Sequence, residues 1–131
     1  MRGFVDSSPL EVCLLDDDAS VLRSMQYLLA SDGIPVRAFA KPDQFLEYAS
    51  IHRVSVVVTD IWMPGITGLE ILARTCALTP RPRVIVITAR DDLAARATAM
   101  AVGPVAFFIK PFNDEQFLAA VHDALAQAEK S

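Results

Sequence analysis

Five short apolar segments alternate with five segments of helical pattern along this chain of 131 residues. The apolar segments are rich in Val, Ile and Leu, and they cover residues 10–15, 34–39, 54–59, 83–88 and 105–109. Between them, apolar residues recur at the three- and four-residue spacing of a helix that buries one face. Such an alternation predicts an α/β fold in which right-handed crossovers join the strands of a parallel sheet.

The order of the strands follows from their composition. Residues 54–59 form a continuous β-branched run, which is typical of a strand covered on both faces. Residues 34–39 include Pro35, which cannot donate a hydrogen bond to a neighbouring strand, so this strand belongs at an outer position. We therefore expect a doubly wound, five-stranded parallel sheet, (βα)5, with the strand order 2-1-3-4-5. Ligands of such sheets bind beyond the carboxyl ends of the strands, where the first and third strands part.

The apolar residues of two expected helices predict which of their faces is buried. The helix over residues 91–101 has the thinnest apolar stripe in the chain, and its expected inner residues are Leu93, Ala97, Met100 and Ala101. With so little burial it could move or pair with a partner at low cost; the alternative is a solvent-facing helix rich in alanine, a strong helix former. The helix over residues 68–78 is expected to bury one side, made of Leu69, Leu72, Ala73 and Cys76.

The composition is that of one globular domain. With 53% hydrophobic residues, the chain can bury a full core, but it has no room for a second domain of ordinary size. The net charge of −4 argues against direct nucleic-acid binding, which needs a basic face. No segment has the pattern of a signal peptide or a membrane span, and Cys13 and Cys76 read as buried free thiols. We expect a cytoplasmic domain over residues 10–129, preceded by a disordered leader over residues 1–9.

Charged and polar side chains follow four of the expected strands. Asp60 closes the run of residues 54–59, and a carboxylate there is costly unless the site needs negative charge. The other strand ends carry carboxylates, a hydroxyl and an ammonium group: Asp16, Asp17, Asp18, Thr88 and Lys110. Converging carboxylates without His or Cys favour Mg²⁺, which takes oxygen ligands. With a hydroxyl and a lysine beside them, they suit a phosphoryl group and a carboxylate nucleophile.

This arrangement resembles the receiver domain of a two-component response regulator over residues 10–128. The residues that carry the resemblance are Asp16-Asp17, Asp60 with Met63-Pro64-Gly65 and Gly68, Thr88-Ala89, Phe107 and Lys110-Pro111-Phe112. Each motif is weak alone, but five in the expected order, at their own strand ends, are specific. The resemblance implies the flavodoxin-like receiver fold, a cis bond between Lys110 and Pro111, and a signalling domain rather than an enzyme.

The resemblance also implies roles at the phosphoryl site. Asp60 would accept a phosphoryl group from the phosphohistidine of a sensor histidine kinase, while Lys110 and Thr88 would contact the phosphoryl oxygens. Thr88 and Phe107 would form a switch, with Phe107 turning inward when Thr88 shifts; the alternative for Phe107 is an ordinary core side chain. The face of the fourth helix, fifth strand and fifth helix would carry the signal, and a homodimer could form through it on phosphorylation.

A Mg²⁺ cofactor is implied by the same family pattern. Asp17 would bind the ion directly and Asp16 mainly through water, while Asp60 and the backbone carbonyl of Trp62 would complete the protein ligands. The indole of Trp62 either shields the acyl phosphate from water or is a half-exposed aromatic group without a kinetic role. Asp18 is then an extra acid, which we expect to cap the first helix.

Three other functions fit this topology less well. A Mg²⁺ phosphohydrolase with an aspartate nucleophile needs a second acid two residues after it, where Trp62 stands. A nucleotide- or flavin-binding module needs a phosphate loop rich in Gly or Ser/Thr after the first strand, whereas aspartates there repel phosphate. A receiver that is not phosphorylated would lack one of the acids, the threonine or the lysine, and the sequence has them all.

Two further sequence features concern output and signal lifetime. The residues around Phe39-Ala40 and over residues 110–114 are similar to those of receivers that precede a helix-turn-helix DNA-binding domain. We therefore expect a transcriptional role through an output domain that is absent from this chain. Arg90, two residues after Thr88, either tunes the access of water to the phosphoryl group or is a plain surface arginine.

Overall fold

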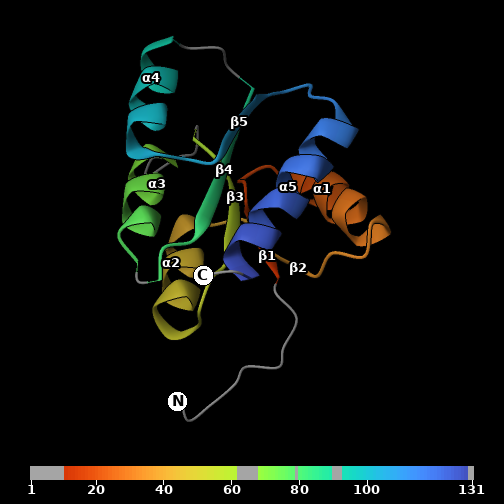
Figure 1. Ribbon diagram of the computed structural model, residues 1–131, viewed down its shortest axis with the longest axis horizontal. Coiled ribbons are helices and arrows are strands. Elements are labelled where there is room, and N and C mark those ends of the chain that lie inside the picture. Colours follow the sequence, from red (N-terminus) through yellow and green to blue (C-terminus); the bar gives the residue numbers. More distant parts are fainter. Residues whose placement is uncertain (1–10, 62–67, 79, 90–92, 130–131) are drawn as a thin grey trace.

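The computed structural model describes residues 11–61, 68–78, 80–89 and 93–129, in which strands and helices alternate (Figure 1). The strands are β1 (Val12–Leu15), β2 (Val36–Phe39), β3 (Val56–Asp60), β4 (Arg83–Thr88) and β5 (Ala106–Ile109). The helices are α1 (Ala19–Ser31), α2 (Pro42–Ile51), α3 (Gly68–Cys76), α4 (Leu93–Val102) and α5 (Asp114–Glu129). The strands are parallel and lie in the order β2-β1-β3-β4-β5, which confirms the predicted fold class and strand order. The predicted leader lies outside the described residues.

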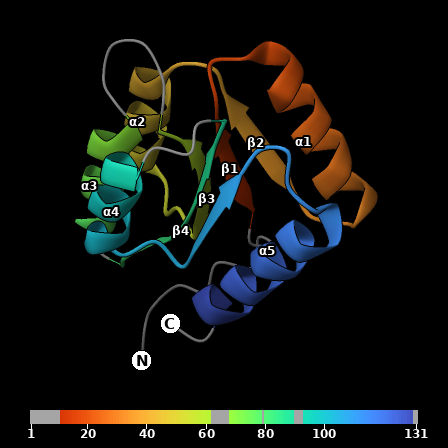
Figure 2. The ribbon, with the colours of Figure 1, turned by 90° about the horizontal axis from the view of Figure 1, so that it is seen from above.

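Helices cover both faces of the sheet. Figure 2 shows α1 and α5 on one face and α2, α3 and α4 on the other. Because successive strand residues point to opposite faces, β1 sends Val12 and Leu14 into one core, and Cys13 and Leu15 into the other. β3 alternates in the same way, which explains why its sequence is apolar throughout. The carboxyl ends of the strands are therefore held rigidly by two packed layers.

Short polar side chains cap the N-terminal ends of two helices. Asp18 caps α1, because its Oδ1 accepts hydrogen bonds from the backbone N–H groups of Ser20 and Val21. Asn113 caps α5 in the same way, with 2.9 Å between its Oδ1 and the backbone nitrogen of Gln116. The Asp18 cap was predicted from the sequence and is confirmed. The two caps fix where the chain turns from the carboxyl edge of the sheet into a helix.

The predicted inner stripe of α4 is wrong. Leu93, Met100, Ala97 and Ala101 are exposed, and the helix instead buries Ala95 and Ala99. Apolar residues occur all around this helix, so their spacing does not single out one face. The two small residues let the helix approach the sheet closely, whereas the bulkier ones would hold it away.

The predicted inner side of α3 needs a smaller correction. Leu72 is buried, and Leu69 and Cys76 are partly buried, as predicted, but Ala73 is exposed. Ile71 takes its place in the core between α2 and the sheet. Alanine contributes little apolar area, so the larger Ile decides which way the helix turns.

The structure confirms two further predictions from the sequence. The Lys110–Pro111 peptide bond is cis, as predicted. Both cysteines are free, as predicted, although Cys76 is only partly buried. Burial raises the pKa of the Cys13 thiol to about 12, so this group stays protonated at neutral pH. Within the described part of the chain, none of the helices has the length and apolar character needed to cross a membrane.

Candidate functional site

Four polar side chains leave the sheet at its carboxyl edge. Asp16 lies one residue beyond β1, and Asp60 is the last residue of β3. The parallel register of these two strands places the two residues side by side. The pairing of β3 with β4 and of β4 with β5 places Thr88 at the end of β4 and Lys110 directly after β5. The backbone N–H of Lys110 donates to the carbonyl oxygen of Thr88 at 2.7 Å, which joins these two strand ends. The sheet thus gathers residues that are distant in sequence.

Lys110 contacts two buried carboxylates at once. Its Nζ lies 3.0 Å from Oδ2 of Asp16 and 3.2 Å from Oδ2 of Asp60. Asp16 is 1% exposed and Asp60 is 6% exposed, so each charge would be costly without a cation nearby. Partial burial by itself lowers the pKa of Lys110, but the hydrogen bond and charge of Asp16, together with those of Asp60, outweigh it and raise the pKa. The ammonium group therefore remains charged at neutral pH.

The acidic run after β1 divides into three different environments. Asp16 is buried, and its Oδ1 accepts the backbone N–H of Asp18 at 2.9 Å, which shapes the turn. Asp17 is exposed, at the rim of the site. The pKa of Asp18 is lowered by the hydroxyl of Ser20 and by the backbone N–H groups of Val21 and Ser20. The structure therefore separates the helix cap from the two acids assigned to the metal.

Thr88 and Phe107 lie on adjacent strands. Thr88 is completely buried at the end of β4. Phe107 is partly buried on β5 and packs against the core that includes Ala95 and Ala99 of α4. The guanidinium carbon of Arg96, also on α4, lies 5.2 Å from the centre of the Phe107 ring. Phe107 therefore contacts the helix that is least buried against the sheet.

Sequence reasoning missed Thr59 as a residue of this site. Its side chain is completely buried, and its Oγ1 donates to the backbone carbonyl of Asp60 at 3.0 Å. The hydroxyl thus holds the peptide group through which Asp60 leaves the strand. The signal was present in the sequence, because Thr59 is the one hydroxyl residue directly before Asp60 in an apolar run, and a buried hydroxyl needs a partner.

The oxygen donors of the site fit a magnesium ion. The carboxylates of Asp16 and Asp60 face one cationic nitrogen, which shows that this edge accommodates positive charge. Mg²⁺ commonly takes one or two carboxylates and keeps several waters. Among the described residues, no three His, Cys, Asp or Glu side chains are grouped so that they alone could hold a metal. Waters and backbone oxygens would have to complete the shell; Trp62, the predicted backbone ligand, and Arg90 lie outside the described residues.

Known proteins share this sequence pattern and fold. The family described as "Response regulator receiver domain" matches residues 12–122. The transcriptional regulatory protein FixJ of Bradyrhizobium diazoefficiens is 34% identical over 118 residues, which are 90% of this chain and 58% of that protein. The response regulator protein TodT of Pseudomonas putida is 31% identical over 117 residues, or 89% of this chain and 52% of that protein. The crystal structure of FixJ-N has a TM-score of 0.82 and 32% identity, and the match covers 91% of this chain and 95% of that one.

The extent of these matches settles the family. The chain spans little more than half the length of the curated relatives named above. The family match, in contrast, covers most of the chain and includes all five strands. Receiver domains are signalling domains of two-component systems, and FixJ is a transcriptional regulator. This chain belongs to the response regulator receiver domain family.

Proposed function

We propose that this chain is a phosphorylation-controlled switch in which Asp60 accepts a phosphoryl group from the phosphohistidine of a sensor histidine kinase. The observation that carries the proposal is the contact of Lys110 Nζ with the buried carboxylates of Asp16 and Asp60. A buried cluster of two acids and one base contributes little to stability, so its presence favours a chemical role. The family match supports the same role, because receiver domains take phosphate from histidine kinases.

The transfer needs a nucleophile and charge stabilisation. A carboxylate oxygen of Asp60 attacks the phosphorus, a P–O bond forms, and the P–N bond breaks with its electron pair going to the histidine ring. The ammonium of Lys110, already 3.2 Å from Asp60, then pairs with the phosphoryl oxygens. The hydroxyl of Thr88 donates to one of these oxygens, and the hydroxyl of Thr59 keeps the peptide of Asp60 in place.

Magnesium belongs to the proposal as the cofactor of this step. The family binds Mg²⁺ at acidic residues, and here Asp16, Asp17 and Asp60 would hold it together with the carbonyl of Trp62. When bound, the ion supplies positive charge that offsets the charge of the phosphoryl oxygens. Asp16 is already anchored by its contact with the backbone of Asp18, so its second oxygen is fixed in direction.

The signal leaves the site through Thr88 and Phe107. Phe107 packs against α4, and α4 exposes Leu93 and Met100, which are 78% and 49% exposed. Val105, before β5, adds to this apolar surface at 44% exposure. In our proposal this α4–β5–α5 face pairs with a second copy on phosphorylation and controls a DNA-binding output domain of a cytoplasmic transcriptional regulator. The domain itself turns over no substrate beyond its own phosphorylation and slow dephosphorylation.

Intact-mass analysis tests the phosphorylation site. The wild-type chain with acetyl phosphate and Mg²⁺ should gain the mass of one phosphoryl group, and the gain should disappear with a chelator. Asp60→Asn, which keeps the size of the side chain, should gain none. An equal mass gain in both proteins would overturn the assignment of Asp60.

Sizing chromatography tests the proposed dimer face. Beryllofluoride with Mg²⁺, which mimics the phosphoryl group, should raise the apparent mass of the wild type. Leu93→Glu on α4 should prevent this increase, whereas Tyr27→Glu on α1, equally exposed in the wild type at 79%, should not. Loss of association in both variants, or in neither, would argue against a dimer through α4.

A further inference from the structure

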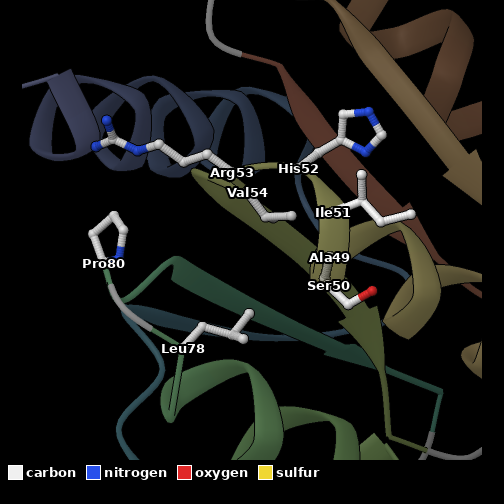
Figure 3. A pocket seen from close by; sticks show the side chains of 8 residues that line it. All are labelled: Ala49, Ser50, Ile51, His52, Arg53, Val54, Leu78 and Pro80. Atoms are coloured by element: carbon white, nitrogen blue, oxygen red, sulfur yellow. The ribbon is translucent and has the colours of Figure 1, made fainter. Parts of the chain in front are cut away.

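A second concave surface lies at the amino edge of the sheet, opposite the phosphoryl site. It is formed by residues 49–54, at the end of α2 and before β3, together with Leu78 and Pro80 (Figure 3). We call it the amino-edge hollow; its volume is about 290 Å³. Val54 lies two residues before β3 and Asp60 ends it, and six residues of extended chain correspond to about 20 Å. The hollow is therefore separate from the site of phosphorylation.

The floor and one rim of the amino-edge hollow are apolar. Val54 is 6% exposed, and Leu78 is partly buried. Ile51 at the rim is 72% exposed, so its apolar side chain is available for contact. An apolar group placed between Ile51 and the floor would remove water from both surfaces, and such a central apolar contact is what anchors most peptide complexes.

The charge around the amino-edge hollow is positive. Its ionisable groups among the described residues are His52 and Arg53, with no Asp or Glu, although the chain as a whole carries −4. The ring of His52 is held by stacking on Tyr48, with 4.3 Å between ring centres. Arg53 is exposed, and its guanidinium has no bonding partner within the described part of the chain. Figure 3 shows it at the Pro80 end, away from His52.

A smaller hollow extends the positive surface toward α5. It shares Arg53 and Pro80 with the first hollow and adds Arg81 and Arg83. The guanidinium of Arg81 donates to backbone carbonyl oxygens, which carry no net charge and so leave its positive charge in place. The volume of the smaller hollow is about 10 Å³, room for about one water, so it adds charge rather than space. The positive charges of Arg53 and Arg81 beside the first hollow suit an elongated anionic occupant better than a compact one.

The amino-edge hollow has an apolar floor and a positive charge at its rim. We therefore infer that it binds an acidic peptide segment of a partner protein. An apolar side chain of the peptide lies against Val54, Leu78 and Ile51, and a neighbouring carboxylate pairs with Arg53. Further acids of the peptide lie on the surface beside Arg81. This contact uses the edge of the sheet opposite Asp60, so it operates whether or not the domain carries a phosphoryl group.

Nuclear magnetic resonance of the ¹⁵N-labelled chain tests this inference. The probe is the end-blocked peptide Gly-Glu-Leu-Asp-Glu-Gly, and its neutral counterpart is Gly-Gln-Leu-Asn-Gln-Gly. The acidic probe should cause saturating shifts in the amides of residues 49–54 and of Arg81 and Arg83, and it should bind at least tenfold more tightly than the neutral one. Arg53→Glu should weaken binding at least tenfold, and Ile51→Ser should weaken it severalfold. Arg23→Glu, an exposed arginine on α1, is the matched control and should bind as the wild type does.

Several outcomes would overturn the inference. They are equal binding of the neutral peptide, no saturating shift, shifts centred on α4, or equal loss in the Arg23 and Arg53 variants. Shifts at the hollow that grow with protein concentration in the absence of peptide would show instead that a second copy occupies it. Arg53→Glu should still gain a phosphoryl group from acetyl phosphate, so a failure here is distinct from a failure of the proposed function.

Discussion

α4 and α5 lie on opposite faces of the sheet beside β5, and their attachments differ (Figure 2). α5 buries one continuous stripe made of Phe117, Val121, Ala124 and Ala128. The ring of Phe117 lies 4.9 Å from that of Phe112 and 5.8 Å from that of Phe108, measured between centres. This aromatic cluster fastens the start of α5 to the strand and to the loop before the helix.

α4 has much less holding it in place. It buries Ala95 and Ala99 and adds the contact between Arg96 and Phe107. Its last turn is tied by Arg81, whose Nη2 donates to the carbonyl oxygens of Val102 and Gly103, each at 3.1 Å. Stability follows buried apolar area, so two alanines resist displacement far less than a buried phenylalanine does. α5 is therefore a fixed support, and α4 is the helix that a change at Thr88 and Phe107 can move at low cost.

Truncating a large apolar side chain on each of the two helices should give the greatest contrast. Phe117→Ala removes a completely buried ring and should lower the free energy of unfolding by about 3–5 kcal/mol. Leu93→Ala, in contrast, removes an exposed side chain of α4 and should change it by less than about 0.5 kcal/mol. Urea denaturation measures both values. Similar losses in the two variants would show that α4 is held as firmly as α5.

A substitution on the observed buried face of α4 should cause the next largest loss of stability. Ala99→Leu adds bulk where the helix touches the sheet and should cost about 1–3 kcal/mol through overpacking. Ala97→Leu makes the same change on the exposed side and should cost almost nothing. Thermal or urea unfolding of the pair decides between the observed face and the one expected from the sequence. A larger loss for Ala97→Leu would restore the original expectation.

This difference between the helices also explains how far the sequence could predict the fold. For α5, the large apolar side chains of Phe117 and Val121 mark one face in the sequence, and the structure buries that face. For α4, most residues are alanine or similarly apolar, and only the space between the helix and β4 selects Ala95 and Ala99. Packing of this kind depends on shapes in three dimensions, which no pattern in the chain expresses.

The candidate site was easier to predict than the helix packing. Because the carboxyl ends of parallel strands meet at one edge of the sheet, the sequence alone predicts that Asp16, Asp60 and Lys110 lie close together. The contact of one ammonium with both carboxylates could not be foreseen, because it depends on the direction of the long Lys110 side chain. The sequence marks Thr59 as a buried hydroxyl that needs a partner, but that this partner is the carbonyl of Asp60 could be seen only in the structure.

Substitution of Gly103, just after α4, should lower stability both through backbone strain and through a steric contact. Its φ of +108° disfavours any side chain, and a Cβ there would lie 2.7 Å from Arg81 Nη2. Gly103→Ala should therefore cost about 1–2 kcal/mol in strain and also displace the guanidinium from α4. Gly33→Ala, with a φ of +75° and open space around it, is the matched control for strain alone. If Gly103→Ala and Gly33→Ala lose the same stability, and amide hydrogen exchange in the last turn of α4 is unchanged, then Arg81 tolerates the extra atom.

The smallest expected loss of stability comes from removing the hydrogen bonds that Arg81 donates to the end of α4. Arg81→Gln shortens the side chain and removes its bonds to the last turn of α4, which should cost about 1 kcal/mol of local stability. Amide exchange in residues 99–103 should then be about fivefold faster, while exchange in α5 stays unchanged. Arg74→Gln removes an arginine from an exposed pair with Glu70 on α3 and should leave α4 unaffected. If α4 exchanges at the wild-type rate in Arg81→Gln, then Ala95 and Ala99 suffice to hold its last turn, and the helix is less easily moved than its small buried face suggests.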